Sequence, residues 1–215
     1  MRDEYRVQLA VVGELLSAMA EHVGQAMREA SRGLLSADRA AADGVLADHA
    51  EVGALRSQVE ERTYEVLALQ APVASDLRVV LTAQHVAADM ERMGNLARHV
   101  ARAALRRYPE NAVVPELTEV FAQMSDIAVR MADKMHTVVA ERDATRAAEL
   151  DRDDDELDAL HRRMFAIMFA PDWTHGAEAA VDAALLGRYY ERYADHAVNA
   201  AAQVIYLVTG EVAAP

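Results

Sequence analysis

The sequence predicts an all-α protein built from two tandem three-helix bundles, and three observations support this prediction. Hydrophobic residues make up 53% of the 215-residue chain but aromatic residues only 5%, so the apolar positions are mostly residue types that helices accept. The chain has only 5 prolines and 9 glycines, and they leave long uninterrupted segments between them. The two halves of the chain also carry matching sequence elements, which indicates an internal repeat.

The first helix is expected from about residue 3 to residue 31. Its apolar residues recur at every fourth position from Val7 to Met27, which is the stripe of an amphipathic helix, and Gly33 lies just past the expected end. Met and Leu side chains on this stripe can pack within the chain or against a second copy of it. A homodimer and a monomer therefore both remain open.

The second and third helices are expected over residues 36–69 and 75–107. Pro72 separates them, because proline disfavours helical backbone at the residue that precedes it. Ser75 and Asp76 are expected to open the third helix, since short polar side chains can accept hydrogen bonds from the unpaired amides of a helix start.

Three more helices are expected in the second half, over residues 115–141, 146–169 and 176–208. Pro171 closes the second of these, and Gly210 is placed to cap the end of the last one. The fourth and fifth helices follow each other with little break.

The two groups of three helices resemble each other in sequence. Glu91-Arg92-Met93-Gly94 aligns with Glu191-Arg192-Tyr193-Ala194, and Val52-Gly53-Ala54-Leu55 aligns with Leu157-Asp158-Ala159-Leu160. The first pair of elements is 100 residues apart and the second pair 105, so the second copy is about five residues shorter. We expect the difference at the turn from Gln70 to Asp76, because loops tolerate length changes.

This repeat divides the chain into a first three-helix unit over residues 1–111 and a second over residues 112–215. Each unit is long enough to form a three-helix bundle with its own apolar core.

Charge and composition restrict the partners. The formal net charge of −13 argues against nucleic acid, because a phosphate backbone requires a basic protein face. The absence of cysteine excludes disulfides and thiolate metal sites and fits a cytoplasmic protein. The chain shows neither a signal-peptide pattern nor the eighteen or so continuous apolar residues of a membrane span, so we expect membrane contact only through partners.

Four carboxylates of the second repeat form a candidate metal site. Glu191 and Asp195 are four residues apart on one expected helix, and Asp154 and Asp158 have the same spacing on the preceding one, so each pair lies on one face of its helix. A short connection makes these two helices antiparallel, which allows the four carboxylates to converge. Such hard oxygen ligands favour Fe, Zn, Mn or Mg ions.

A second interpretation of these residues does without a metal. Acidic pairs at this spacing are common in an acidic helical protein, and the acidic run over residues 153–156 is also typical of a solvated face. Arg188 and Arg192 can pair with the acids, whereas His196 lies close enough to join a metal site.

The first repeat departs from this acidic pattern. Its equivalent positions hold Glu91, Asn95, His49 and Gly53, so one acid of four remains. We expect a metal in the second repeat only, with the first binding it weakly or not at all.

The sequence does not predict an enzyme. It shows no nucleophile with a recognisable base and no glycine-rich phosphate loop, and the scattered histidines, His161 among them, share no motif. A carboxylate-bridged metalloprotein of the di-iron helical-bundle type is the alternative, although such sites use two Glu-x-x-His motifs that this chain lacks. A helical adaptor without metal also remains open.

Four segments together resemble the PhoU family of phosphate-uptake regulators, and the resemblance covers nearly the whole chain. They are the turn Gln70–Arg78, the element Glu91–Gly94, its repeat Glu191–Asn199 and the closing segment Val204–Gly210. The segments occur in the order and spacing of the family.

The resemblance implies two three-helix bundles with pseudo-twofold symmetry. It also implies a family motif, Glu or Asp followed three residues later by Asp, that binds multinuclear metal clusters on the bundle surface. Glu191 and Asp195 fit this motif, and Asp154 and Asp158 match acidic positions of the family, whereas the first-repeat positions depart from it.

The resemblance further implies a negative regulator of phosphate uptake and of the phosphate-starvation response. Such a protein is a non-enzymatic adaptor that links the phosphate ABC transporter, with its cytoplasmic ATPase and permease, to a sensor histidine kinase. The turn Gln70–Arg78 is a candidate contact surface for these partners.

Overall fold

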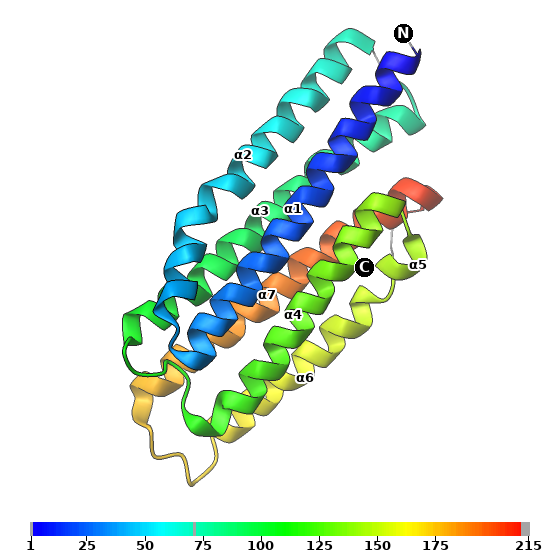
Figure 1. Cartoon of the computed structure of the whole chain (residues 1–215). Helices are drawn as coiled ribbons and strands as arrows, with labels where there is room; N and C mark the ends of the chain where they lie inside the picture. Colours follow the sequence, from blue (N-terminus) through cyan, green and yellow to red (C-terminus); the bar gives the residue numbers. More distant parts are fainter. Residues whose placement is uncertain (1, 71, 212–215) are drawn as a thin grey trace.

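The computed structural model describes the backbone of residues 2–70 and 72–211, and the side chains of the same residues apart from 2–6 and 49. This part of the chain forms seven helices and no strand (Figure 1). They are α1 (Arg2–Ser36), α2 (Arg39–Gln70), α3 (Ser75–Arg107), α4 (Pro115–Glu141), α5 (Ala144–Ala147), α6 (Leu150–Met168) and α7 (Gly176–Thr209).

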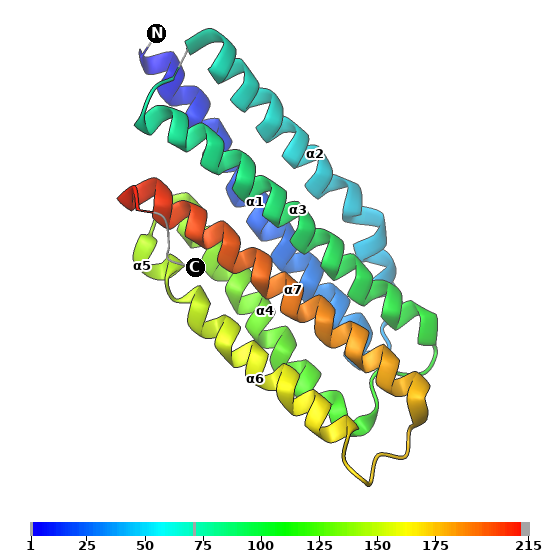
Figure 2. The ribbon, with the colours of Figure 1, turned by 180° about the vertical axis from the view of Figure 1, so that it is seen from behind.

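Two three-helix bundles lie side by side, one made of α1, α2 and α3 and the other of α4, α6 and α7 (Figures 1 and 2). The two bundles contact each other through two pairs of helices, α1 with α4 and α3 with α7. Equivalent helices of the two repeats therefore meet across a pseudo-twofold axis. The fold class predicted from the sequence is confirmed.

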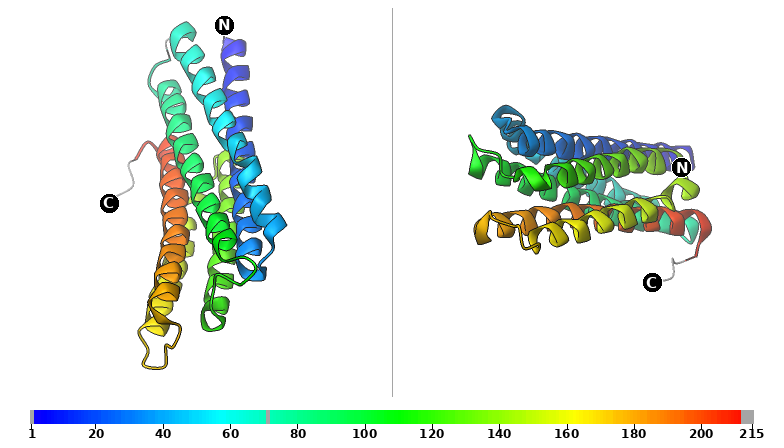
Figure 3. Two further views of the ribbon diagram at one scale, coloured as in Figure 1. Left: turned by 90° about the vertical axis from the view of Figure 1, so that its left-hand side faces the viewer. Right: turned by 90° about the horizontal axis from the view of Figure 1, so that it is seen from below.

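The first bundle is longer than the second and extends beyond it at the end where α2 passes into α3 (Figure 3). Helix α2 has 32 residues, whereas α6 has 19. The connection from Met168 to Gly176 is longer than that from Gln70 to Ser75. The second repeat is therefore shorter because its middle helix is shorter, and the expectation that the turn accounts for the difference was wrong.

Helix α1 continues past Gly33, where the sequence predicted its end, to Ser36. A Cβ atom on Gly33 would lie 3.0 Å from the Cβ of Ala42 and 3.2 Å from the carbonyl oxygen of Asp38. This glycine therefore serves the close approach of α2 to α1 and does not end the helix. Asp38 caps α2, since its Oδ1 accepts a hydrogen bond of 3.1 Å from the amide of Ala41.

Of two other helix ends, the sequence predicted the cap of the first wrongly and the cap of the second correctly. Helix α3 starts at Ser75, but its N-cap is Ala74 and no side chain caps it, so the capping role expected for Ser75 and Asp76 was wrong. At the other end of the chain, Gly210 adopts φ 78 and its amide donates to the carbonyl oxygen of Tyr206 at 2.9 Å, as the sequence predicted.

The segment of the fifth expected helix is divided into α5 and α6 at residues 148 and 149, and Asp143 is the N-cap of α5. Its Oδ1 accepts hydrogen bonds of 3.0 Å from the amides of Thr145 and Arg146, which starts the short helix α5. After one turn the chain enters α6, whose last residue is Met168.

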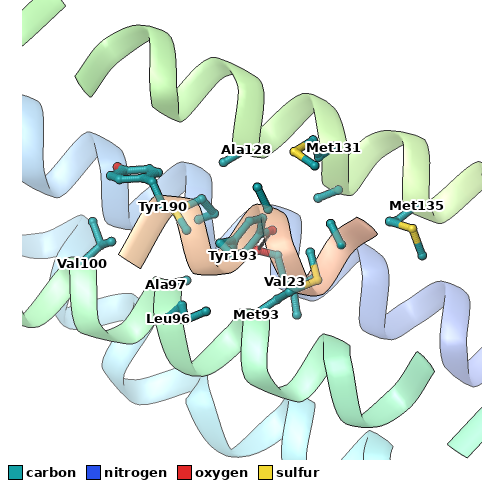
Figure 4. Close-up of a cluster of buried hydrophobic side chains, with 14 of the residues drawn as sticks. Val23, Met93, Leu96, Ala97, Val100, Ala128, Met131, Met135, Tyr190 and Tyr193 are labelled. Atoms are coloured by element: carbon teal, nitrogen blue, oxygen red, sulfur yellow. Dashed lines mark hydrogen bonds between the residues drawn. The ribbon is translucent and has the colours of Figure 1, made fainter. Parts of the chain in front are cut away.

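Methionine, alanine and valine dominate the core, and two tyrosines of α7 lie at its centre between α1, α3 and α4 (Figure 4). The hydroxyl of Tyr193 donates to the carbonyl oxygen of Val23 at 3.1 Å, and the hydroxyl of Tyr190 lies 2.7 Å from Oγ of Ser31. Both tyrosines are fully buried, and burial raises the pKa of each well above its ordinary value. They therefore remain neutral and connect the second repeat to α1 of the first.

The apolar stripe of α1 packs within the chain from Met19 to Met27, whereas Val7 at its start is 63% exposed. Met19 and Met27 are fully buried, and a Cβ atom on Gly24 would lie 3.0 Å from the Cβ of Ala132 on α4. The homodimer remains a prediction. Over the residues that the structure describes, no helix combines the length and apolar character of a membrane span.

Candidate metal centre in the second repeat

The four predicted carboxylates lie on α6 and α7, which run antiparallel and pack against each other (Figure 2). Gly187 permits this packing, because a Cβ atom there would lie 2.7 Å from Cε of Met164 and 2.9 Å from Cδ2 of His161. The bare glycine backbone brings α7 close to α6 one turn before Glu191.

Three of the four acids influence one another electrostatically. Asp154 is half-buried, and burial, followed by the charges of Asp158 and Asp195, raises the pKa of its carboxyl to about 6. Its Oδ1 is buried and accepts no hydrogen bond from the residues that the structure describes. This carboxylate therefore has an unsatisfied oxygen and lies near the negative charges of Asp158 and Asp195.

Glu191 faces basic groups as well as the acids. Its Oε2 lies 2.6 Å from Nη1 of Arg188 and 3.6 Å from Nδ1 of His161, and the hydrogen bond to Glu191 raises the pKa of Arg188. Asp158 lies 3.7 Å from Arg162. The pairing of Arg188 with an acid, which the sequence left open, is present.

His196 does not turn toward the four acids. Its Nδ1 lies 2.9 Å from Oδ1 of Asp89 on α3, so it belongs to the contact between the two repeats. Within the described part of the chain, no three His, Asp or Glu residues are positioned to share one metal ion. The metal site at Asp154, Asp158, Glu191 and Asp195 therefore remains a prediction.

The donor atoms nevertheless suit a divalent cation. Oδ1 of Asp154 and Nε2 of His161 are buried without a hydrogen-bond partner in the described structure, whereas Oε2 of Glu191 lies 2.6 Å from Nη1 of Arg188. Carboxylate oxygens and an imidazole nitrogen are ligands of Zn²⁺, Fe or Mn²⁺. Sequence reasoning assigned no role to His161. The only signal in the sequence is that the 105-residue offset aligns His161 with Arg56, so the two repeats differ at this position.

The equivalent place in the first repeat is organised differently. Arg56 donates to Glu91 and to Glu60, so the one remaining acid is neutralised by an ion pair. The side-chain amide of Asn95 donates to the carbonyl oxygen of Glu91 at 3.1 Å, within α3. The side chain of His49 lies outside the described residues. That the first repeat binds metal weakly or not at all remains a prediction.

The architecture and the acidic face on α6 and α7 define a class of protein, the duplicated three-helix bundle. The PhoU domain model matches the chain twice, over residues 16–104 and 121–204. The chain therefore belongs to the PhoU family.

Curated relatives match over the full length. The phosphate-specific transport system accessory protein PhoU homolog 2 of Mycobacterium tuberculosis is 43% identical over 210 residues, which cover 98% of this chain and 99% of the relative. PhoU homolog 1 of Mycobacterium leprae is also 43% identical, with 98% and 95% covered.

Solved structures share the fold. PhoU from Pseudomonas aeruginosa superposes with a TM-score of 0.87 at 26% identity and covers 96% of this chain and 100% of its own. The regulatory protein PhoU from Streptococcus pneumoniae gives the same TM-score at 22% identity and supports the fold alone.

Proposed function

We propose that this chain is an accessory and regulatory protein of phosphate transport. It acts in the cytoplasm as a negative regulator of phosphate uptake and of the phosphate-starvation response, and as an adaptor between the phosphate ABC transporter and a sensor histidine kinase. The observation that carries this proposal is the 43% identity over nearly the whole chain to a phosphate-specific transport system accessory protein.

The surface of the first bundle supports a binding role over a catalytic one. Its free end carries large apolar side chains that are strongly exposed, with Leu69 at 71% and Val73 at 73%, and Leu77 and Leu81 follow on α3. Exposed apolar groups gathered at one end are typical of a protein interaction site. They coincide with the turn from Gln70 to Arg78 that the sequence suggested as a contact surface.

The adaptor role can be tested in a strain that lacks the gene. With ample phosphate, the wild-type protein is expected to repress a reporter driven by a phosphate-starvation promoter. The variant Leu69→Asp/Val73→Asp should leave the reporter active, because two charges at this end would disrupt an apolar contact.

The matched control is Phe169→Asp in the equivalent turn of the second repeat, where the side chain is 80% exposed. It should repress like the wild type. Repression by both variants would remove the contact surface from the proposal, and no repression by the wild type would contradict the regulatory function.

We also propose that the second repeat binds a divalent or trivalent metal ion through Asp154, Asp158, Glu191 and Asp195. Elemental analysis of protein purified without chelator should find metal in the wild type and in Glu91→Ala. Glu191→Ala/Asp195→Ala should lose it, since two of four hard ligands are removed. Wild-type protein that remains metal-free after reconstitution with Fe, Zn, Mn and Mg would contradict the site.

A further inference from the structure

Helix α3 of the first repeat carries two arginines, Arg98 and Arg102, that the second repeat lacks. The offset that aligns α3 with α7 matches them with Val198 and Ala202. Two positive charges one helical turn apart stand out in a chain with a formal net charge of −13.

Among the residues whose side chains the structure describes, Arg98 and Arg102 have no acidic partner. They lie four residues apart on α3, one turn from each other on the same face, and neither takes part in an ion pair of the described residues. Nε of Arg98 is buried and has no hydrogen-bond partner there. Glu91, two turns earlier on the same helix, is already held by Arg56 and does not compensate them.

The surroundings of His99 report the same excess of positive charge. Its ring stacks on Tyr189 of α7 with 5.1 Å between the ring centroids. Burial, followed by the charges of Arg102 and Arg98, lowers the pKa of His99 below its ordinary value. Arg98, His99 and Arg102 thus form a cluster in which the two arginines disfavour protonation of the His99 ring. A bound anion would favour protonation of that ring.

We propose that Arg98 and Arg102 bind a tetrahedral oxyanion of the phosphate class. Residues four apart on a helix are separated by about 6 Å along its axis, so the guanidinium groups of Arg98 and Arg102 can direct several N–H donors at one anion between them. A phosphate has four oxygens and can accept from both guanidiniums, and such charge-assisted bonds are the strong ones. The site does not involve the metal ligands and does not depend on the proposed regulatory role.

Inorganic phosphate is the probe, and the His99 imidazole is the reporter. Its pKa is measured by NMR titration, with the resonance assigned through His99→Gln, in phosphate and in chloride at matched ionic strength. Phosphate should raise the pKa of His99 by about half a unit or more, because an anion within about 6 Å favours the protonated ring. Phenyl phosphate in place of inorganic phosphate tests whether the site takes a phosphate carried on an ester.

The variant Arg98→Gln/Arg102→Gln should lose this shift and bind phosphate at least tenfold more weakly by calorimetry. Arg163→Gln, which removes an exposed arginine of α6, should behave like the wild type. Since Arg98 is partly buried, Arg102→Gln alone provides a second variant at an exposed position. An unchanged pKa of His99 in phosphate, or equal binding by the wild type and both Arg102 variants, would overturn the proposal.

Discussion

Replacing Asp154 by asparagine should stabilise the metal-free protein at neutral pH. Asp154 has a raised pKa, so its ionised form is disfavoured by folding. The stability that the neutral carboxyl provides is fully present below its ordinary pKa of 3.8 and is lost as the pH rises through about 6. Above that pH the wild type folds with an unfavourable charge, and Asp154→Asn removes it.

The size of the effect follows from the shift. A rise of the Asp154 pKa from 3.8 to about 6 corresponds to about 3 kcal/mol in the free energy of unfolding if the whole shift acts on stability. The carboxyl is only half-buried and solvent screens the neighbouring acids, so we expect about 1 to 1.5 kcal/mol. Asparagine retains the shape of the side chain, and the carbonyl oxygen of its amide can replace the unsatisfied Oδ1.

The assay is urea unfolding in chelator at several pH values, with Asp126→Asn as the control. Asp126 is an exposed acid of α4, and its removal changes the net charge by the same amount. Above about pH 6.5, the free energy of unfolding of Asp154→Asn should exceed that of the wild type and that of the control. This difference should disappear near pH 4. Equal gains from both substitutions, or a gain that persists at pH 4, would refute the reasoning.

Four further substitutions test the packing. Gly94→Ala should raise the free energy of unfolding by about 1 kcal/mol, since its Cβ would meet neighbours at an ordinary 3.6 Å, whereas Gly24→Ala should lower it because its Cβ would meet α4 at 3.0 Å. Tyr190→Phe should cost about 1 to 2 kcal/mol by leaving Ser31 buried without a partner. Asp182→Asn should cost about 1 to 3 kcal/mol, and less in high salt, because it removes the negative charge and one of the two buried oxygens that accept from Arg106 and Arg107. Urea denaturation checks each one, and unchanged midpoints would contradict the packing argument.

The helices were predictable because their signals are local. Pro72 and Gly210 act through their own backbone, so the sequence places the corresponding helix ends correctly. Gly33 was misjudged because its role depends on Ala42, which approaches it from another helix. The short α6 was missed because no single residue indicates that a helix is shorter than its counterpart in the other repeat.

The candidate site was predictable only in part. Spacing on one helix placed Glu191 and Asp195 on a common face and Arg188 within reach of Glu191, but it could not show that His161 would approach Glu191. That contact depends on how side chains fill the space between α6 and α7. The unpaired Arg98 was missed for the same reason, because an unpaired charge is defined by what surrounds it in space.

The two repeats also differ in the core. The same offset of 100 residues aligns Met90 and Met93 with Tyr190 and Tyr193. All four side chains are fully buried, so the exchange keeps the packing but adds two hydroxyl groups to the second repeat. Those hydroxyls reach α1 of the first repeat, which methionine could not do through a hydrogen bond of comparable strength. The duplicated helices thus preserve the apolar interface, while the divergent positions supply directed hydrogen bonds between the two repeats.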